Sequence, residues 1–104
     1  MKASSKGKAV ITGASSGIGA ICADRLARRG HDLILVARNR EGLDAVATRI
    51  GVQTARSVEV IVADLNERSD RARIEQVLRS DSSITVLVNN AGAIAPTRLL
   101  DSNV

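Results

Sequence analysis

Short apolar runs alternate with segments of helical periodicity along this chain, and that alternation constrains the fold more than any other feature. The apolar runs lie at residues 9–11, 33–37, 58–63 and 84–88. Apolar residues recur at helical spacing between the runs, which predicts the order strand, helix, strand, helix, strand, helix, strand. The runs are continuous, which indicates strands buried on both faces, and strands separated by helices are most simply parallel. We therefore expect an α/β fold that forms the first half of a doubly wound parallel sheet.

Four residues mark where the helices are expected to begin and end. Gly30 follows the first helical segment and supplies a C-terminal stop. Asn39 is placed to cap the second helix, and Asn66 is placed to cap the third. Gly51 either ends the second helix or lies inside it, and the local sequence leaves both possibilities open.

The composition limits the chemistry that the chain can perform. Its 104 residues suffice for one small domain. It has no Tyr, Trp or Phe, and so lacks the side chains on which single-stranded nucleic acids stack. One Cys excludes an internal disulfide and a Cys-based zinc site, and one His excludes most His-ligated metal sites.

The formal net charge of +4 raises the question of a nucleic-acid partner. Arg25, Arg28 and Arg29 share one helical face, which we expect to be a solvated surface and not a phosphate-binding patch. The hypothesis that the chain binds nucleic acid rests on its charge alone. It predicts that the protein binds DNA with an affinity that falls as the salt concentration rises. We expect no nucleic-acid partner.

No apolar run approaches the ~18 residues that a transmembrane helix requires, so we expect no membrane span. The apolar run at residues 9–11 is also too short for the core of a signal peptide. With a single unpaired Cys and no export signal, the expected location is the cytoplasm.

A glycine-rich loop, TGASSGIG at residues 12–19, connects the first strand to the first helix. Gly13 permits a tight turn out of the strand, Gly17 permits close approach of the backbone to a phosphate, and Gly19 permits close packing of helix on sheet. The N-terminus of the helix then offers free N–H groups and the positive end of its dipole to a pyrophosphate. The loop therefore predicts a dinucleotide site.

Two other motifs compete for this part of the chain. A P-loop requires Gly-Lys-Ser/Thr, whereas Gly7-Lys8 is followed by Ala9 and precedes the strand. Residues 13–17 (GASSG) match the nucleophile elbow of hydrolases, which needs a downstream acid and then a His. His31 directly follows the first helix and leaves no room for that triad, so the dinucleotide loop is the favoured interpretation.

Further residues after the third and fourth strands complete a recognisable set. Asp64-Leu65 follows the third strand, and residues 89–92 (NNAG) follow the fourth. Together with the loop at 12–19, this set resembles the short-chain dehydrogenase/reductase family over nearly the whole chain. The resemblance implies a Rossmann-type doubly wound parallel sheet with strand order 3-2-1-4 and crossover helices, and residues 1–104 would be an incomplete dinucleotide-binding domain.

The resemblance also assigns roles to single residues. In the family the aspartate matched by Asp64 contacts the adenine ring, the Asn-Asn-Ala-Gly motif steadies the central sheet, and its second Asn lies beside the cofactor ribose. Asp64 could instead cap the next helix, and Asn89-Asn90 could be a turn that binds no ligand. The residues expected to contact the cofactor are Gly13, Ser15, Ser16, Gly17, Ile18, Gly19, Arg38, Asn39, Asp64, Leu65, Asn90, Ala91 and Gly92.

The end of the second strand predicts which nicotinamide cofactor binds. A carboxylate at this position accepts hydrogen bonds from both ribose hydroxyls and selects NAD, whereas an Arg pairs with the 2′-phosphate of NADP. Here Ala37 stands where the acid would be, and Arg38 follows it. We therefore expect NADP in preference to NAD, with Arg40 assisting; the alternative is that Arg38 is only a solvated residue at the end of the sheet.

The catalytic residues of the family have no counterparts here. The family uses a Ser, a Tyr-x-x-x-Lys pair and an Asn, whereas this sequence has no Tyr, and its three Lys are Lys2, Lys6 and Lys8. We assign no catalytic residue and expect the NADP-binding portion of an oxidoreductase, interrupted at its C-terminus and inactive alone. In a longer chain, a small alcohol or carbonyl compound would be the substrate. The alternative is a stand-alone NAD(P)-binding module; the oligomeric state does not follow from the sequence.

Overall fold

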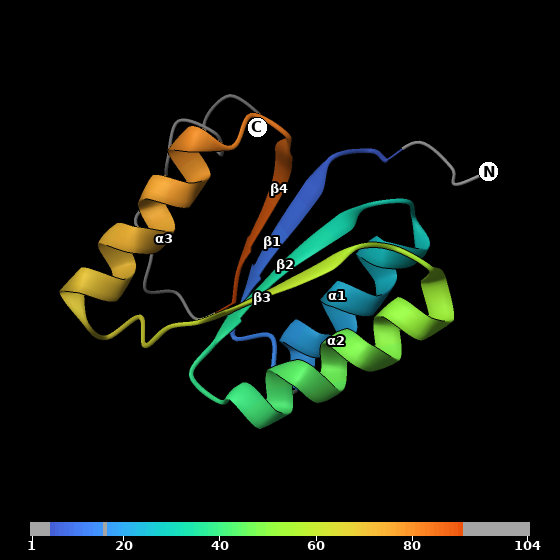
Figure 1. Ribbon diagram of the computed structural model, residues 1–104, viewed down its shortest axis with the longest axis horizontal. Coiled ribbons are helices and arrows are strands. Elements are labelled where there is room, and N and C mark those ends of the chain that lie inside the picture. The colour runs from blue at the N-terminus through green and yellow to red at the C-terminus, as the bar shows by residue number, and fades with distance from the viewer. Residues whose placement is uncertain (1–4, 16, 91–104) are drawn as a thin grey trace.

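The computed structural model describes residues 5–15 and 17–90, where strands and helices alternate in the predicted order (Figure 1). The strands are β1 (Lys8–Thr12), β2 (Asp32–Ala37), β3 (Val58–Val62) and β4 (Ile84–Asn89). The helices are α1 (Gly17–Arg28), α2 (Arg40–Thr54) and α3 (Arg68–Ser80). In the described residues, no helix is long and apolar enough to cross a membrane.

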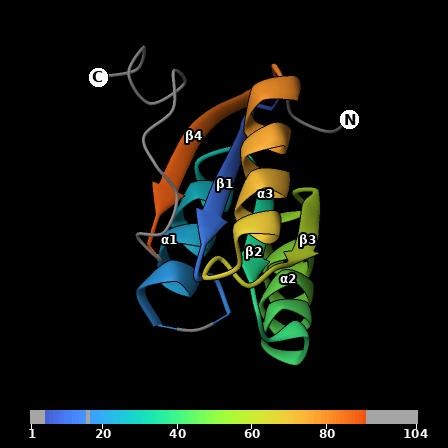
Figure 2. The same cartoon turned by 90° about the vertical axis from the view of Figure 1, so that its left-hand side faces the viewer.

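The strands form one parallel sheet in the order β3-β2-β1-β4, which confirms the expected fold class and strand order. Figure 2 shows all four strands pointing toward the same edge of the sheet. We call this edge, where the strands end, the carboxyl edge, and the opposite one the amino edge. The strand order reverses between β1 and β4, and in open sheets of this kind ligands bind at the carboxyl edge beside such a reversal.

Helices cover both faces of the sheet, with α1 and α2 on one face and α3 on the other (Figures 1 and 2). Neighbouring residues of a strand point to opposite faces. Leu33 and Leu35 accordingly lie in the core beneath α1 and α2, while Ile34 and Val36 lie in the core beneath α3. All four are at most 1% exposed, which explains why the strands are continuous apolar runs.

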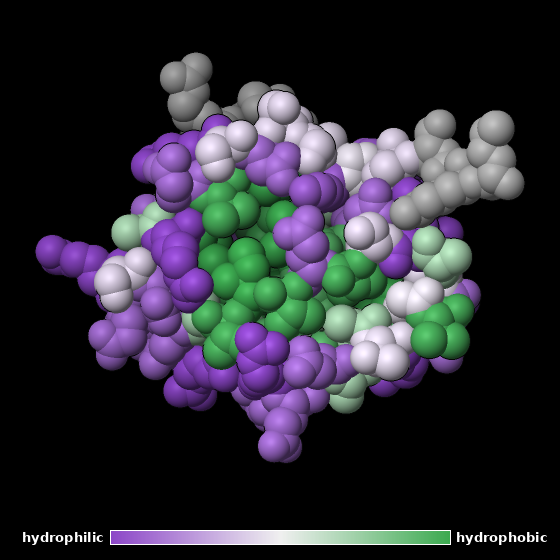
Figure 3. Space-filling model, in the orientation of Figure 1, coloured by the Kyte–Doolittle hydropathy of each residue, from purple (hydrophilic) through white to green (hydrophobic). Residues whose placement is uncertain are grey.

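Strand β3 forms one edge of the sheet, and its apolar side chains are only half buried. Figure 3 shows an apolar area over this strand, between α3 and α2, with hydrophilic side chains around it. Glu59 and Lys8 place charge on the strands near this edge, which limits pairing with other chains.

The helix ends confirm two of the local expectations and correct a third. Gly30, at φ +104°, follows the end of α1, and the Asn39 side chain caps α2 by accepting a hydrogen bond from the Gly42 N–H at 3.1 Å. The cap predicted at Asn66 is wrong, because Glu67 is the N-cap residue of α3. The Asn66 N–H is held by Asp64 Oδ1 at 3.0 Å, so Asn66 belongs to the preceding turn.

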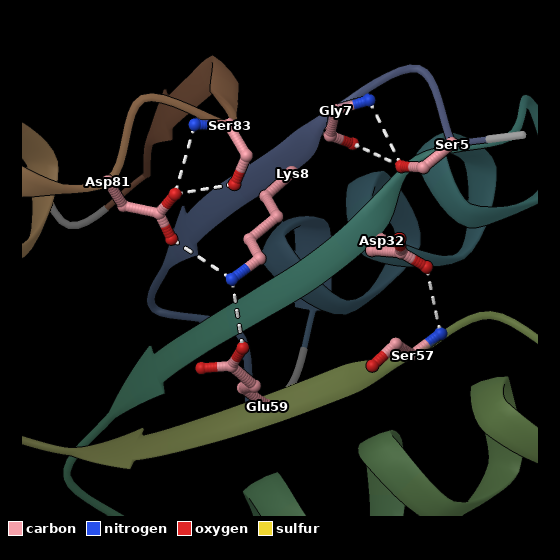
Figure 4. A network of polar contacts seen from close by, with 8 residues as sticks. All are labelled: Ser5, Gly7, Lys8, Asp32, Ser57, Glu59, Asp81 and Ser83. Atoms are coloured by element: carbon pink, nitrogen blue, oxygen red, sulfur yellow. Dashed lines mark hydrogen bonds and ion pairs between the residues drawn. The ribbon is translucent and has the colours of Figure 1, made fainter.

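Ion pairs connect the elements at the amino edge. Lys8 Nζ lies 3.0 Å from Asp81 Oδ2 and 3.2 Å from Glu59 Oε1, so one ammonium group joins β1 to β3 and to the turn before β4 (Figure 4). Asp81 also accepts hydrogen bonds from the hydroxyl and N–H of Ser83. The Ser83 hydroxyl and the Lys8 ammonium hold the pKa of Asp81 at about 2, and the same carboxylates raise the pKa of Lys8.

Candidate functional site

The turns that follow β1, β2 and β3 meet at the carboxyl edge, together with the end of β4 (Figure 2). They bring together most of the residues predicted to contact a cofactor. Three predicted positions, Ser16, Ala91 and Gly92, lie outside the described residues. The predicted positions that the structure describes are Gly13, Ser15, Gly17, Ile18, Gly19, Arg38, Asn39, Asp64, Leu65 and Asn90.

The glycines of the loop occupy positions that other residues would not tolerate. Gly13 has φ +65° and Gly17 has φ +60°, in the left-handed region that favours glycine. A Cβ atom on Gly19 would collide with the carbonyl oxygen of Gly13, so the close approach of helix to strand requires this glycine. A Cβ on Gly17 would meet no atom within 4 Å, so the backbone faces open space at the start of α1.

Hydrogen bonds to the ends of β2 and β4 hold the loop against its neighbours. The Ala14 N–H donates to the Val36 carbonyl at 3.2 Å, which ties the loop to the end of β2. The Asn90 side-chain amide donates to the Gly13 carbonyl at 3.4 Å, which ties it to the end of β4. The buried Thr12 hydroxyl lies 3.3 Å from Oδ1 of Asn89, the last residue of β4, so the end of β4 also contacts the end of β1. These contacts show that Asn89 and Asn90 help to hold the β1 end and the glycine loop.

The end of β2 presents its positive charge to solvent. Ala37 is 9% exposed and packs in the core beneath α1 and α2, while Arg38 and Arg40 are exposed. Asn39, between them, is occupied in capping α2. Gly42, in the first turn of α2, lies against the glycine loop, since a Cβ there would stand 3.0 Å from Ser15 Cβ. This contact was not predicted, and its only signal in the sequence is a glycine three residues after the cap.

The turn after β3 is ordered by carboxylates. Asp64 does not cap α3, so that alternative is wrong; its own N–H donates to Asp70 Oδ2 at 2.8 Å. Leu65 is only 7% exposed and packs in the core beneath α3, and its carbonyl accepts a hydrogen bond from Arg71 Nη1 at 3.0 Å. Asp70 was not predicted, and its signal was an acidic residue in the first turn of the third helix.

The arrangement favours an anionic, extended ligand. Helices α1 and α2 both begin at this edge, and each N-terminus presents the positive end of a helix dipole. Arg38 adds a full positive charge beside the start of α2. Ile18, at the start of α1, is 70% exposed and gives the site an apolar side chain.

Comparison with known proteins identifies the class. The family model described as "short chain dehydrogenase" matches residues 7–103, nearly the whole chain. The chain therefore belongs to the short-chain dehydrogenase/reductase family, a family of oxidoreductases with a Rossmann-type fold.

Individual relatives share this part of the fold. The chain is 45% identical over 89 residues to a very-long-chain 3-oxoacyl-CoA reductase of Anas platyrhynchos, covering 81% of this chain and 27% of that protein. It superposes on a bulky-bulky ketone specific alcohol dehydrogenase from Comamonas testosteroni with a TM-score of 0.80 and 51% identity, covering 83% and 35%. A short-chain dehydrogenase from Sphingobium yanoikuyae in complex with NADPH gives a TM-score of 0.79 and 51% identity, covering 81% and 33%. The chain thus spans about a third or less of the length of each of these proteins.

Proposed function

We propose that the carboxyl edge binds NADP(H), and that the chain is the cofactor-binding portion of an oxidoreductase that moves a hydride between NADP(H) and an alcohol or carbonyl compound. The relatives named as a 3-oxoacyl-CoA reductase and a ketone-specific alcohol dehydrogenase support a ketone as the carbonyl compound. The relative described in complex with NADPH supports the cofactor.

The glycine loop fits the pyrophosphate of a dinucleotide. The open space beside Gly17 lets a phosphate approach the backbone at the start of α1. There the first N–H groups of the helix have no partners within the helix and can donate to phosphate oxygens. The contacts of Asn90 and Ala14 fix the loop in this shape before a ligand arrives, so little ordering entropy opposes binding.

The exposed guanidinium of Arg38 is the observation that carries the choice of NADP. It stands directly after β2, where a carboxylate would accept hydrogen bonds from the ribose hydroxyls of NAD. The neighbouring Ala37 supplies no such acceptor. A guanidinium can instead form two charge-assisted hydrogen bonds with a 2′-phosphate, and Arg40 adds positive charge two residues further on.

Asp64 and Asn90 complete the proposed site. Asp64 is half buried after β3, where its carboxylate is held by the Asn66 N–H and can accept from the adenine amino group. Asn90 lies after β4 on the other side of the loop, where the ribose beside the nicotinamide would be. The remaining predicted contacts, Ser16, Ala91 and Gly92, lie outside the described residues.

The bound cofactor supplies the hydride, and the carbonyl oxygen then needs a proton donor. The Tyr and Lys that serve the family in this step have no counterparts among the 104 residues. We therefore expect these residues alone to bind cofactor without turnover. Steady-state assays with NADPH and a panel of ketones test this, and robust turnover by the 104-residue chain would contradict it.

Titration of NADPH and NADH against the Arg38→Ala variant tests the choice of cofactor. Losing a charge-assisted contact of roughly 1.5–3 kcal/mol should weaken NADPH binding by roughly 10- to 150-fold and leave NADH binding almost unchanged. Arg79→Ala is the matched control, since Arg79 is exposed in the last turn of α3 at the amino edge.

A second variant is designed to make the site favour NAD over NADP. Ala37→Asp with Arg38→Ala introduces a carboxylate for the ribose hydroxyls, although the burial of Ala37 makes the single variant the cleaner comparison. A wild-type protein that prefers NADH would show that Arg38 is only a solvated residue.

A further inference from the structure

A basic cavity lies at the amino edge, on the opposite side of the sheet from the glycine loop. Its volume is about 560 Å³, and it is bounded by the ends of α1 and α2 and the segment before β1. Figure 1 shows these two helix ends near the starts of β2 and β3. Four of its lining residues are cationic, namely Lys6, Arg28, Arg29 and Arg56. Nothing in the proposed cofactor site uses any of them.

Two of these cations are fixed in place by acids and still present donors. Arg28 donates from Nε to Asp24 and from Nη2 to Gln53 Oε1, both at 3.0 Å, so it joins α1 to α2. Arg56 donates from Nε to Asp32 Oδ1 at 3.2 Å. Because Gln53 accepts through its oxygen, its amide nitrogen remains a further donor for the cavity that it lines.

The guanidinium of Arg56 is not satisfied by its one carboxylate. Its side chain is only 7% exposed, and its Nη2 atom is buried with no hydrogen-bond partner among the described residues. A buried charged donor without an acceptor is unfavourable, and an acceptor supplied by a ligand with a small movement of the side chain would relieve it.

The other two cations lie at the rim without ion pairs to the described residues. Lys6 packs against Gly30. Its N–H donates to the Gly30 carbonyl at 3.0 Å, and a Cβ on Gly30 would lie 3.5–3.6 Å from the Lys6 side-chain carbons. Arg29 is exposed directly after α1. The four cations therefore exceed the two acids, Asp24 and Asp32, that pair with them.

The carbonyl ends of two helices would oppose an anion here, but those carbonyls are largely occupied. At the end of α1 the N–H groups of Arg29, Gly30 and His31 donate to carbonyls of the last helical turn. At the end of α2 the Ala55 N–H donates to the Gly51 carbonyl, and the Thr54 hydroxyl donates to the Ile50 carbonyl. The two positive charges that Asp24 and Asp32 leave uncompensated outweigh the partial charges that remain.

We propose that this cavity binds a small phosphorylated molecule, with the phosphate among Lys6, Arg28, Arg29 and Arg56. The cavity is large enough for a phosphate and a small organic group, and its positive side chains come from three separate segments of the chain. Such a ligand binds independently of the cofactor, because its donors all lie at the amino edge.

Pyrophosphate is a suitable probe, and backbone amide shifts of the whole 104-residue chain report where it binds. Pyrophosphate should shift the amides of Gly30, Thr54 and Arg56 in a saturable way, and these shifts should persist in Arg38→Ala. The double variant Lys6→Gln/Arg29→Gln should weaken this site by about tenfold or more. The matched control Arg49→Gln/Arg79→Gln removes two exposed arginines outside the cavity and should leave it unchanged.

Three outcomes would overturn the proposal. One is an equal loss of affinity in the two double variants, which would mark a response to net charge alone. Another is that chloride at matched ionic strength shifts the amides of Gly30, Thr54 and Arg56 as much as pyrophosphate does. The third is pyrophosphate binding confined to the glycine loop and abolished by Arg38→Ala.

Thermal unfolding gives a second measurement of the same site. Pyrophosphate should raise the Tm of the wild type and of the control double variant more than that of Lys6→Gln/Arg29→Gln.

Discussion

The two edges of the sheet are stabilised by different means. At the carboxyl edge the glycine loop is held by uncharged hydrogen bonds, from the Ala14 N–H to the Val36 carbonyl and from the Asn90 side-chain amide to the Gly13 carbonyl. At the amino edge main-chain hydrogen bonds, such as that from the Lys8 N–H to the Ser83 carbonyl, are joined by ion pairs, as where Lys8 Nζ lies between two carboxylates. Glycine shapes the first edge, and charge pairing shapes the second.

This difference separates stability from ligand binding. Among the described residues Arg38 makes no ion pair, so its charge at the carboxyl edge is free for an incoming phosphate. Lys8 is satisfied by Asp81 and Glu59 far from that site. Substitutions at the carboxyl edge should therefore change cofactor binding, whereas substitutions in the Lys8 ion pairs should change stability and its pH dependence.

The largest expected effect comes from Gly19→Ala at the carboxyl edge. The added Cβ meets the Gly13 carbonyl group, which is backbone and has little room to move. We expect a loss of about 1–3 kcal/mol in the free energy of unfolding, together with strongly weakened NADPH binding, because the loop must shift. Urea unfolding and NADPH titration measure the two effects.

Gly51→Ala is the control for that substitution. Gly51 lies inside α2, and a Cβ there would be no closer than 4.0 Å to another part of the structure. Alanine should raise stability by roughly 0.5–1 kcal/mol, because it favours the helix, and leave NADPH binding unchanged. If Gly19→Ala behaved like Gly51→Ala, the close contact between loop and helix would be contradicted.

A smaller effect is expected at the amino edge, in the dependence of stability on pH. Because the pKa of Asp81 is lowered to about 2 in the folded chain, its ionised form stabilises the fold above the unfolded pKa near 4. That contribution is lost as the pH falls from about 4 to 2. Asp81→Asn should remove this pH dependence, so that the free energy of unfolding falls by about 1 kcal/mol less than in the wild type between these pH values. The effect is small because the carboxylate is partly exposed and screened.

Ser83→Ala sharpens the same comparison. The Ser83 hydroxyl is the main cause of the lowered pKa of Asp81, so its removal should raise that pKa toward the usual range. Carboxyl chemical shifts followed by NMR through acid pH, from above the usual Asp pKa of about 4 to below about 2, measure the change. An unchanged pKa of Asp81, or altered NADPH affinity in this variant, would contradict the separation between the two edges.

Sequence alone predicts the parts of the fold that depend on local pattern. The four apolar runs became strands because residues such as Leu33 and Ile34 fill opposite cores. Asn39 was predictable as a cap because the interaction spans only three residues. The glycine loop was predictable because its shape is demanded by steric contacts that only glycine permits, as at Gly19.

Features that depend on tertiary contacts were not predictable. Asn66 has the right side chain for a cap, but Asp64 holds its N–H in a turn and α3 begins later. Helix α2 continues through Gly51 and ends at Thr54, and its C-cap residue Ala55 adopts φ +58° where a local rule would place glycine. The ion pair that joins Lys8 to Asp81 links residues 73 positions apart, and nothing in either local sequence indicates it.

The most direct test of the account is an amide chemical-shift map of the chain during titration with NADPH. We expect saturable shifts at Gly13, Gly17, Gly19 and Arg38, with the amides near Lys8 and Asp81 unchanged. NADH, which lacks the 2′-phosphate, should shift the glycine loop at higher concentration and affect Arg38 much less. Shifts concentrated at the amino edge, or an Arg38 response equal for the two dinucleotides, would contradict the assignment of the carboxyl edge as an NADP site.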